Sequence, residues 1–369
     1  MLLIVVMYII INLRKKPSVH LNSIDAIVPA YNEEPCLEES LKSLFANPYI
    51  NKVICVNDGS SDGTEKLLDR MVKEWPEKLI AVNQKNTGKG GALMNGLNFA
   101  TMPQVFLTDA DTYVPPDKNG LGYMLAEIEK GADAVGGIPS SNLNQALFLP
   151  YIRATVKMPM IIMKRTFQQW FGGAPFIISG SCGMFKTNVL KQHGFSDRTK
   201  VEDLDLTWTL VANGYKIKQA NRCIVYPQEC NTLVDEWKRW RRWIAGYAVC
   251  MKLHKKLLLT RYGVFSIFPM FLVIIYSLWT YSSYFLQENI DIYNIVFIFF
   301  PVVWLAIVFS IGLFSALYHR SWKLFFLAPL AIFYVLLAYF IWIIYGLPAF
   351  LTGKEPTRDK PTRYKNVVE

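Results

Sequence analysis

Three long segments without a charged residue occupy the C-terminal part of this chain and restrict its fold more than any other feature. They are residues 264–286, 295–317 and 325–350, and none contains Lys, Arg, Asp or Glu. Each is long enough to cross a bilayer as a helix, which takes roughly 20 apolar residues. Buried helices of a soluble protein are the alternative, but three such segments in succession favour a membrane. The sequence therefore predicts transmembrane helices within residues 263–351.

A shorter apolar stretch, residues 1–13, begins the chain and is followed by Arg14, Lys15 and Lys16. A cleaved signal peptide has its positive charge before the apolar stretch and small residues after it. Because the order is reversed here, residues 1–16 are predicted to form an uncleaved membrane anchor with its basic end in the cytoplasm.

The chain carries a formal net charge of +10. Nucleic-acid binding is one explanation, but no basic stripe with interleaved aromatic residues lies outside the parts next to the predicted membrane segments. Contact with anionic lipid and an anionic substrate explains the charge better. A lipid bilayer is therefore expected as a partner, and nucleic acid is not. The six cysteines include no C-x-x-C pair, which argues against a zinc site and favours reduced thiols.

The region before the long apolar segments alternates between short apolar runs and helical patterns. The predicted strands are residues 24–29, 52–57, 79–83, 103–107 and 132–137. The predicted helices between them are residues 38–45, 65–73 and 92–100. Strand and helix in alternation predict an α/β fold with a doubly wound parallel sheet and right-handed crossovers. We expect this domain to cover residues 20–235, with interfacial helices at 236–262.

Two carboxylates one residue apart, Asp109 and Asp111, follow the predicted strand 103–107. Side chains alternate along a strand, so these two face the same way. The carboxyl end of a strand is also where open α/β sheets bind their ligands. Such a pair suits a hard divalent cation that keeps some waters and shares its shell with phosphates. A solvated turn is the alternative, so the rest of the chain must decide.

Other polar residues are predicted to lie near this pair. Residues 31–33 and Asp58 also follow carboxyl ends of strands, and residues 88–91, Gly-Lys-Gly-Gly, precede a helix. Free N–H groups and the positive end of the helix dipole favour an anion there. Glycines before a helix more often form only a turn, but the neighbouring acidic residues favour a phosphate site.

The second half of the domain contains further candidate motifs. Residues 151–170 combine bulky apolar side chains with four basic ones and no acidic one, as in an interfacial helix, although an ordinary surface helix is the alternative. Ser179 and Gly180 lie in a loop of small residues. Glu202 and Asp203 open a predicted helix, where acidic side chains often only cap the helix.

A basic and aromatic cluster, residues 237–243, lies just before the apolar segments. In a helix, Arg239, Arg242 and Trp243 share one face. Such clusters next to a membrane commonly anchor a protein to lipid headgroups, and that is the alternative to a role in a binding site.

Taken in order, these motifs resemble membrane-integrated family 2 glycosyltransferases, inverting enzymes that include hyaluronan, chitin, cellulose and poly-N-acetylglucosamine synthases. The resemblance runs over about residues 24–250. The matching motifs are Pro29-Ala30-Tyr31-Asn32-Glu33, Asn57-Asp58-Gly59-Ser60, Gly88-Lys89-Gly90-Gly91-Ala92-Leu93, Asp109-Ala110-Asp111, Ser179-Gly180, Glu202-Asp203 and Arg239-x-x-Arg242-Trp243. No single motif is specific, but their common order is.

The resemblance implies a role for each matching residue. The donor pocket would be lined by Tyr31, Glu33, Asp58, Lys89, Asp109 and Arg242. Asp111, with Asp109 beside it, would hold Mg²⁺ or Mn²⁺ on the diphosphate. Asp203 would be the general base by its motif position, although the chemistry could also use Glu202. The acceptor side would consist of Trp243, Ser179, Gly180 and Arg239.

The implied activity is transfer of a sugar from a UDP-sugar to a growing β-linked polysaccharide, with export through the enzyme's own spans. Two departures from the family bear on this. Asn57 stands where the family usually has an acid, which weakens the case for uracil recognition. Arg239 stands where Gln is common, and this, together with Ser179-Gly180 and Glu202-Asp203, slightly favours the poly-N-acetylglucosamine branch, with UDP-GlcNAc as one candidate donor. The closest alternative adds one sugar to a lipid or a short glycan, and a non-catalytic membrane scaffold is the alternative of another class.

The resemblance also implies a multi-pass plasma-membrane protein with a cytoplasmic catalytic domain and a small membrane partner subunit. The tail, residues 352–369, is basic and so prefers the cytoplasm. Three C-terminal spans would place it outside. One explanation is that one segment does not cross the membrane, and the candidate is 325–350, which contains Pro329 and Pro348. The other is that the tail lies outside despite the preference of basic segments for the cytoplasm. The tail also resembles post-membrane segments that reach back to the active site in this family.

Overall fold

The computed structural model describes residues 19–20, 23–116, 120–143, 147–269, 291–357 and 362–364. The predicted anchor at residues 1–16 and most of the predicted span at 264–286 lie outside the described residues. The account below concerns the described ranges.

An eight-stranded sheet forms the centre of the domain, with the strand order β3-β2-β1-β4-β7-β6-β8-β5. The strands are β1 (Ile24–Ala30), β2 (Ile50–Asn57), β3 (Leu79–Asn83), β4 (Gln104–Leu107), β5 (Thr112–Tyr113), β6 (Ala134–Pro139), β7 (Gly183–Lys186) and β8 (Ile217–Pro227). The predicted strands thus all occur, with boundaries shifted by a few residues.

The sheet is mixed, and the prediction of a wholly parallel sheet is wrong at β7 and β5, whereas β6 and β8 pair in parallel. Strands β3, β2, β1 and β4 are parallel as predicted. β7 lies antiparallel between β4 and β6, and β5 is antiparallel to β8. The direction of β7 depends on where the long connection after β6 delivers the chain, and the local pattern that predicts a strand does not encode this.

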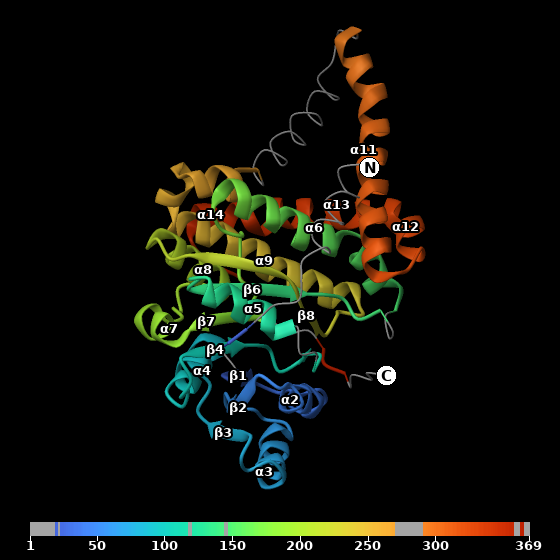
Figure 1. Ribbon diagram of the computed structural model, residues 1–369. Coiled ribbons are helices and arrows are strands. Elements are labelled where there is room, and N and C mark those ends of the chain that lie inside the picture. Colours follow the sequence, from blue (N-terminus) through green and yellow to red (C-terminus); the bar gives the residue numbers. More distant parts are fainter. Residues whose placement is uncertain are drawn as a thin grey trace.

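Helices cover both faces of the sheet (Figure 1). They are α2 (Leu37–Phe45), α3 (Thr64–Glu74), α4 (Gly88–Leu97), α5 (Gly120–Glu129), α7 (Thr187–His193) and α8 (Glu202–Ala212). Successive side chains of β1 face opposite sides: Ala26 and Val28 pack with α2, α3 and α5, whereas Ile27 packs with α4 and α8. Because both faces are apolar, both need a helical cover, and the predicted α/β class is confirmed.

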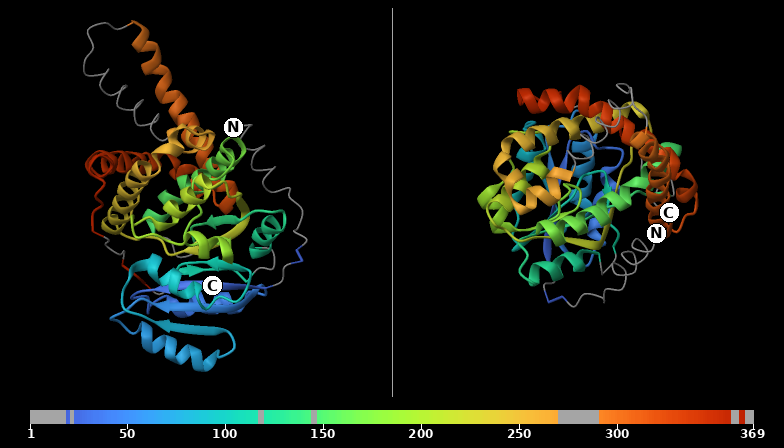
Figure 2. Two further views of the ribbon diagram at one scale, coloured as in Figure 1. Left: turned by 90° about the vertical axis from the view of Figure 1, so that its left-hand side faces the viewer. Right: turned by 90° about the horizontal axis from the view of Figure 1, so that it is seen from above.

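A second helical layer lies beyond β6 and β8, at the end of the sheet that is farthest from the edge strand β3 (Figures 1 and 2). It contains α6 (Phe148–Gly172), α9 (Leu233–Leu253) and the short turns η1 (Lys255–Leu259) and η2 (Gly263–Ile267). α6 continues through Pro159 and packs against the C-terminal helices. Several of its apolar side chains are nonetheless exposed, among them Phe148, Met160 and Trp170.

The C-terminal helices are α11 (Asp291–His319), α12 (Lys323–Leu327), η3 (Ala328–Ala331), α13 (Ile332–Ile341), η4 (Trp342–Gly346) and α14 (Leu347–Thr352). In the part of the chain that the structure describes, one helical stretch, Lys323–Thr352, is long and apolar enough to cross a membrane, and Leu305–His319 is a shorter apolar helix. The predicted anchor of several spans is therefore not confirmed. α11 projects away from the body, whereas α13, η4 and α14 lie against α9 (Figure 2).

Candidate functional site

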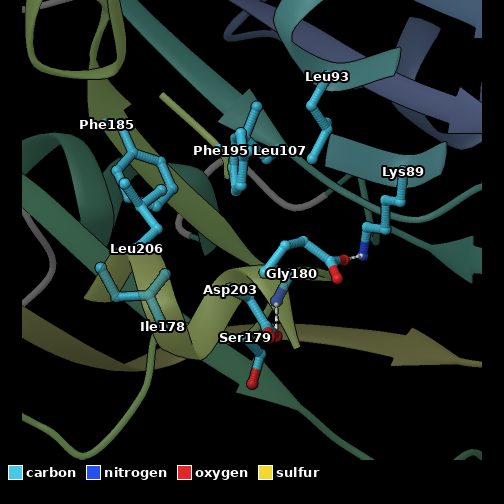
Figure 3. A pocket seen from close by; sticks show the side chains of 11 residues that line it. Lys89, Leu93, Leu107, Ile178, Ser179, Gly180, Phe185, Phe195, Asp203 and Leu206 are labelled. Carbon is cyan, nitrogen blue, oxygen red and sulfur yellow. Dashed lines mark hydrogen bonds and ion pairs between the residues drawn. The ribbon is translucent and has the colours of Figure 1, made fainter. Parts of the chain in front are cut away.

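Side chains from four separate parts of the chain meet near the carboxyl end of β4. Lys89, in the first turn of α4, places its Nζ 2.5 Å from Oδ1 of Asp109 and 3.4 Å from Oε1 of Glu202. Asp203, beside Glu202 on α8, accepts a hydrogen bond from the N–H of Gly180 at 2.9 Å (Figure 3). A small cavity opens here, and its polar lining consists of Lys89, Ser179, Gly180, Glu202 and Asp203.

The charges of this cluster shift one another's pKa values. Burial opposes the charge of Lys89, but Asp109 and then Glu202 outweigh it and raise the pKa of the ammonium group. Burial likewise works against ionised Asp109, yet Lys89 keeps the pKa of that carboxyl below its usual range. The pKa of Asp203 is raised, first by burial and then by the negative charge of Glu202. Of Asp109 and Asp203, the more basic carboxylate is thus Asp203, and raised basicity is the property a general base needs.

Asp58 lies after β2 and shapes the loop that presents Lys89. Its carboxylate accepts the backbone N–H of Thr87 at 2.8 Å and that of Gly88 at 2.9 Å, together with the side-chain amide of Gln84 at 2.8 Å. Gly88 has a φ of +83°, which a side chain would strain. Tyr31 and Glu33 lie in the loop after β1.

Asp111 lies beside a residue that the sequence did not single out, Arg363 of the tail. Nη1 of Arg363 is 2.6 Å from Oδ2 of Asp111, and its Nε is 2.8 Å from Oε2 of Glu33. The next residue, Tyr364, donates its hydroxyl to the backbone oxygen of Glu229 at 2.7 Å. The tail therefore returns to the catalytic domain, and Figure 1 shows its red end beside β1 and α2. The available signals were the basic composition of the tail and its resemblance to segments that reach back to the active site, but they named no particular residue.

Asp111 and its neighbours fit a divalent cation. Among the described residues, no group of three or more His, Cys, Asp or Glu side chains is arranged to hold a metal ion. Mg²⁺ does not need such a group, because it commonly takes one or two protein carboxylates and completes its shell with phosphates and water. Asp111 is only 7% exposed and here has a cation as its neighbour. Burial raises the pKa of Asp111 and Arg363 counteracts that effect, so the position favours a positive charge.

The basic and aromatic cluster lies on α9. Arg242 is close enough to Asp109 to help lower the pKa of that carboxyl, after the larger effects of Lys89 and Arg363. The ring of Trp243 has two guanidinium groups over it, those of Arg239 at 5.5 Å and of Arg153 from α6 at 5.6 Å from the ring centre. Both distances are within the range of cation–π attraction.

The arginines that flank Trp243 belong to a buried ionic network that sequence reasoning missed. Arg239 donates to Glu236 at 2.9 Å through Nε and at 2.5 Å through Nη2. Arg153 pairs with Glu229, and Lys157 lies 2.5 Å from the same carboxylate. The guanidinium of Arg239 is thus bound to carboxylates and to the Trp243 ring, so direct contact with an acceptor stays a prediction.

Comparisons with known proteins relate this chain to glycosyltransferases. Residues 25–194 match the family model of Glycosyl transferase family 2. The chain is 66% identical over 359 residues to the uncharacterized glycosyltransferase YaiP of Escherichia coli K12, covering 97% of this chain and 90% of that protein. It is also 32% identical over 244 residues to poly-beta-1,6-N-acetyl-D-glucosamine synthase of Staphylococcus aureus, covering 64% of this chain and 58% of the synthase.

A solved structure shares the fold over almost the whole chain. It is the mannosyltransferase PcManGT from Pyrobaculum calidifontis in complex with GDP-Man and Mn²⁺, with a TM-score of 0.58, 19% identity and 95% coverage of both chains. The site formed by Lys89, Asp109, Glu202 and Asp203 thus lies within a known glycosyltransferase fold. This chain is a glycosyltransferase, and its residues 25–194 match the family 2 model.

Proposed function

We propose that this enzyme transfers a sugar, with inversion, from a UDP-sugar to a growing β-linked polysaccharide, and that UDP-GlcNAc is the first donor to test. The observation that carries the proposal is the placement of Asp203 and Lys89 at one small cavity, with Asp109 paired to Lys89. The relation to a poly-beta-1,6-N-acetyl-D-glucosamine synthase supports the choice of donor and of a polymeric product.

In the proposed reaction, the acceptor hydroxyl attacks the anomeric carbon from the face opposite the nucleotide. A new bond forms between that oxygen and the anomeric carbon, while the bond from this carbon to the phosphate oxygen breaks. UDP leaves with the bonding electron pair, and Asp203 takes the hydroxyl proton. General-base assistance of this kind is typically worth about 10²–10⁴-fold in rate.

The departing diphosphate gains negative charge, and cationic side chains at the site are suited to stabilise it. Lys89 and Arg242 lie next to Asp109 and could contact the phosphates. Asp111, with Asp109, would hold Mg²⁺ or Mn²⁺, and the bound ion would neutralise part of the leaving-group charge. Trp243 would offer its ring to the apolar face of an acceptor sugar. The remaining roles are proposed as the resemblance implies them. The donor pocket would also include Tyr31, Glu33 and Asp58, and the acceptor side would include Ser179, Gly180 and Arg239.

We further propose a plasma-membrane location with a cytoplasmic catalytic domain, a lipid bilayer as partner and a small membrane subunit as a possible associate. Support comes from the apolar helices Leu305–His319 and Lys323–Thr352 and from the exposed apolar side chains of α6.

The test is to incubate the full-length enzyme with a panel of UDP-sugars and either Mg²⁺ or Mn²⁺, and to measure released UDP and product length. We expect turnover of UDP-GlcNAc in preference to UDP-glucose, and a product of many residues. A product extended by a single sugar would replace the polymerase with the single-transfer alternative. No consumption of any nucleotide sugar would favour a non-catalytic scaffold.

A further inference from the structure

Arg165, on α6, is buried close to the candidate base without a carboxylate to neutralise it. Its side chain is 8% exposed, and its Nη2 donates to the hydroxyl of Ser179 at 3.0 Å. Its Nη1 is buried and has no hydrogen-bond partner among the residues that the structure describes. Within the same ranges, no ion pair to Asp or Glu involves this guanidinium.

This arrangement does little for the stability of the fold. Burying a charged group is unfavourable unless it is paired and hydrogen-bonded. Burial lowers the pKa of Arg165 to about 10, and the nearby Tyr247 and Asp203 offset only part of that effect. Because burying this charge without a carboxylate partner is unfavourable for folding, a function in the adjacent site explains Arg165 better than packing does.

The contact with Ser179 leads directly to Asp203. Ser179 precedes Gly180, whose N–H donates to Oδ2 of Asp203 at 2.9 Å, while Oδ1 accepts the N–H of Leu204 at 2.9 Å. The Gly180 segment also packs tightly: a Cβ built on this glycine would lie 2.7 Å from Nζ of Lys89. The orientation of the Asp203 carboxylate therefore depends on where Ser179 holds the Gly180 amide.

We propose that Arg165 is a positioning residue for the candidate base: by holding Ser179, it fixes the amide that orients the Asp203 carboxylate toward the acceptor. The proposal rests on the proposed function, because it takes Asp203 as the base. It predicts an effect on the chemical step and not on donor binding, since Arg165 contacts neither Lys89 nor Asp109.

The test compares Arg165→Met, Arg165→Lys and Lys164→Met in the full-length enzyme. Arg165→Met should lower kcat by about tenfold or more, because even a small displacement of a catalytic group strongly lowers the rate of the chemical step. Its KM for the UDP-sugar should stay within about twofold of the wild type. Its thermal midpoint should be equal or higher, because a buried unpaired charge has been removed. Arg165→Lys should restore part of the lost kcat.

Lys164 provides the matched control. It is the neighbouring basic residue, its Nζ lies 5.3 Å from the ring centre of Phe176, and burial lowers its pKa to about 8. Lys164→Met removes the same charge from the same helix without touching Ser179, so kcat should not change. A double-mutant cycle adds a second readout: after Arg165→Met, Ser179→Ala should have little further effect on kcat, because both variants break one link.

The proposal is overturned if Arg165→Met keeps the wild-type kcat, or if its loss of activity is matched by a lower thermal midpoint that Arg165→Lys does not rescue. Asp203→Asn separates this failure from that of the proposed function. An inactive Asp203→Asn beside a fully active Arg165→Met would refute only the role of Arg165. An active Asp203→Asn would instead refute the assignment of the base.

Discussion

Glu202 and Asp203 are neighbours on α8, yet their surroundings differ in a way that separates their roles. Glu202 lies 3.4 Å from Nζ of Lys89, so a cation balances its charge. Asp203 instead accepts two backbone N–H groups, from Gly180 and from Leu204. Despite these donors, burial and then the charge of Glu202 raise the pKa of Asp203, which supports Asp203 as the base.

The pH dependence of the reaction should report this difference. Asp203 works as a base only when ionised, so activity should fall as the pH drops through its raised pKa. The charge of Glu202 is the second largest cause of that raised pKa, after burial. Glu202→Gln should therefore move the acidic limb of the kcat profile to lower pH. An abolished activity would contradict this expectation and would favour Glu202 as the base.

The contact of Arg363 with Asp111 and Glu33 leads to a prediction about metal affinity. A cation that already neutralises these carboxylates competes with a divalent ion for them. Arg363→Met should therefore increase the affinity of the donor-free enzyme for Mn²⁺ by about fivefold or more, a coupling of ordinary size. Titration of Mn²⁺ followed by electron paramagnetic resonance measures it directly. Lys354→Met, which removes an exposed charge of the same tail, is the control, and equal affinities for both variants would contradict the competition.

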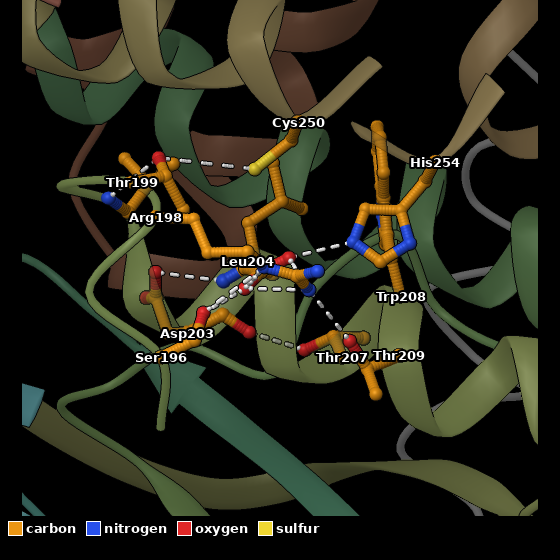
Figure 4. Close-up of polar contacts among 12 residues, drawn as sticks. Ser196, Arg198, Thr199, Asp203, Leu204, Thr207, Trp208, Thr209, Cys250 and His254 are labelled. Carbon is orange, nitrogen blue, oxygen red and sulfur yellow. Dashed lines mark hydrogen bonds and ion pairs between the residues drawn. The ribbon is translucent and has the colours of Figure 1, made fainter. Parts of the chain in front are cut away.

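At the scale of elements, the position of α8 depends on Asp205, which joins three segments; its partners Ser196, Arg198 and His254 are labelled in Figure 4. Its carboxylate accepts the Ser196 hydroxyl at 2.5 Å, pairs with Arg198 at 2.8 Å and lies 2.6 Å from Nε2 of His254 at the end of α9. α8 carries the candidate base in its first turn, so these contacts hold the base in place from the side facing away from the cavity.

Asp205→Asn should destabilise the protein. It leaves Arg198 and His254 without their carboxylate, and breaking a buried ion pair typically lowers the free energy of unfolding by about 3–5 kcal/mol. Because Arg198 is half exposed, we expect about half of that range. His254, then Ser196 and Arg198, outweigh burial and keep the pKa of Asp205 below its usual range, so its stabilisation is present at neutral pH and lost as the pH falls through the lowered pKa.

Thermal unfolding of Asp205→Asn at pH 7 and at a pH well below 3.8, the ordinary pKa of an aspartate, checks this prediction. The difference from the wild type should be smaller at the lower pH, because the wild-type carboxylate then contributes less. An equal difference at both pH values would show that the charge of Asp205 does not stabilise α8.

Local patterns predicted the elements well and their partners poorly. Apolar runs and turn residues were enough to place β1 to β4 and α2 to α4, because periodicity along a short segment determines these elements. The insertion of β7 between β4 and β6 could not be read, since four residues carry no information about a neighbour 75 or more positions away. The same reason hid Arg363, Arg165 and Arg153, whose partners lie in distant segments. Motif order, in contrast, did select Lys89, Asp109 and Asp203, which the fold brings together.

At the scale of the whole molecule, the docked tail constrains the topology. Arg363 and Tyr364 contact the catalytic domain, so the tail and that domain lie on the same side of any membrane. Any crossings by residues 263–351 would then be even in number, which favours the alternative in which one predicted span does not cross. Residues 325–350 fit that alternative, because η4 and α14 pack along α9.

Cysteine labelling in oriented vesicles tests this topology. All six native cysteines are buried, so an introduced exposed cysteine should be the principal target. Lys354→Cys in the tail and Lys66→Cys on α3, both at exposed positions, should react with a membrane-impermeant maleimide from the same side. Labelling from opposite sides would show that the tail does not return to the catalytic domain.

The central claim is that Asp203 takes the acceptor proton in a transfer from a nucleotide sugar. Its most direct test is UDP release by Asp203→Asn, with Asp69→Asn, an exposed acid on α3, as the matched control. We predict that Asp203→Asn loses turnover by about 10² or more while its folding and donor binding are kept, and that Asp69→Asn equals the wild type. Wild-type turnover in a folded Asp203→Asn enzyme would contradict the account.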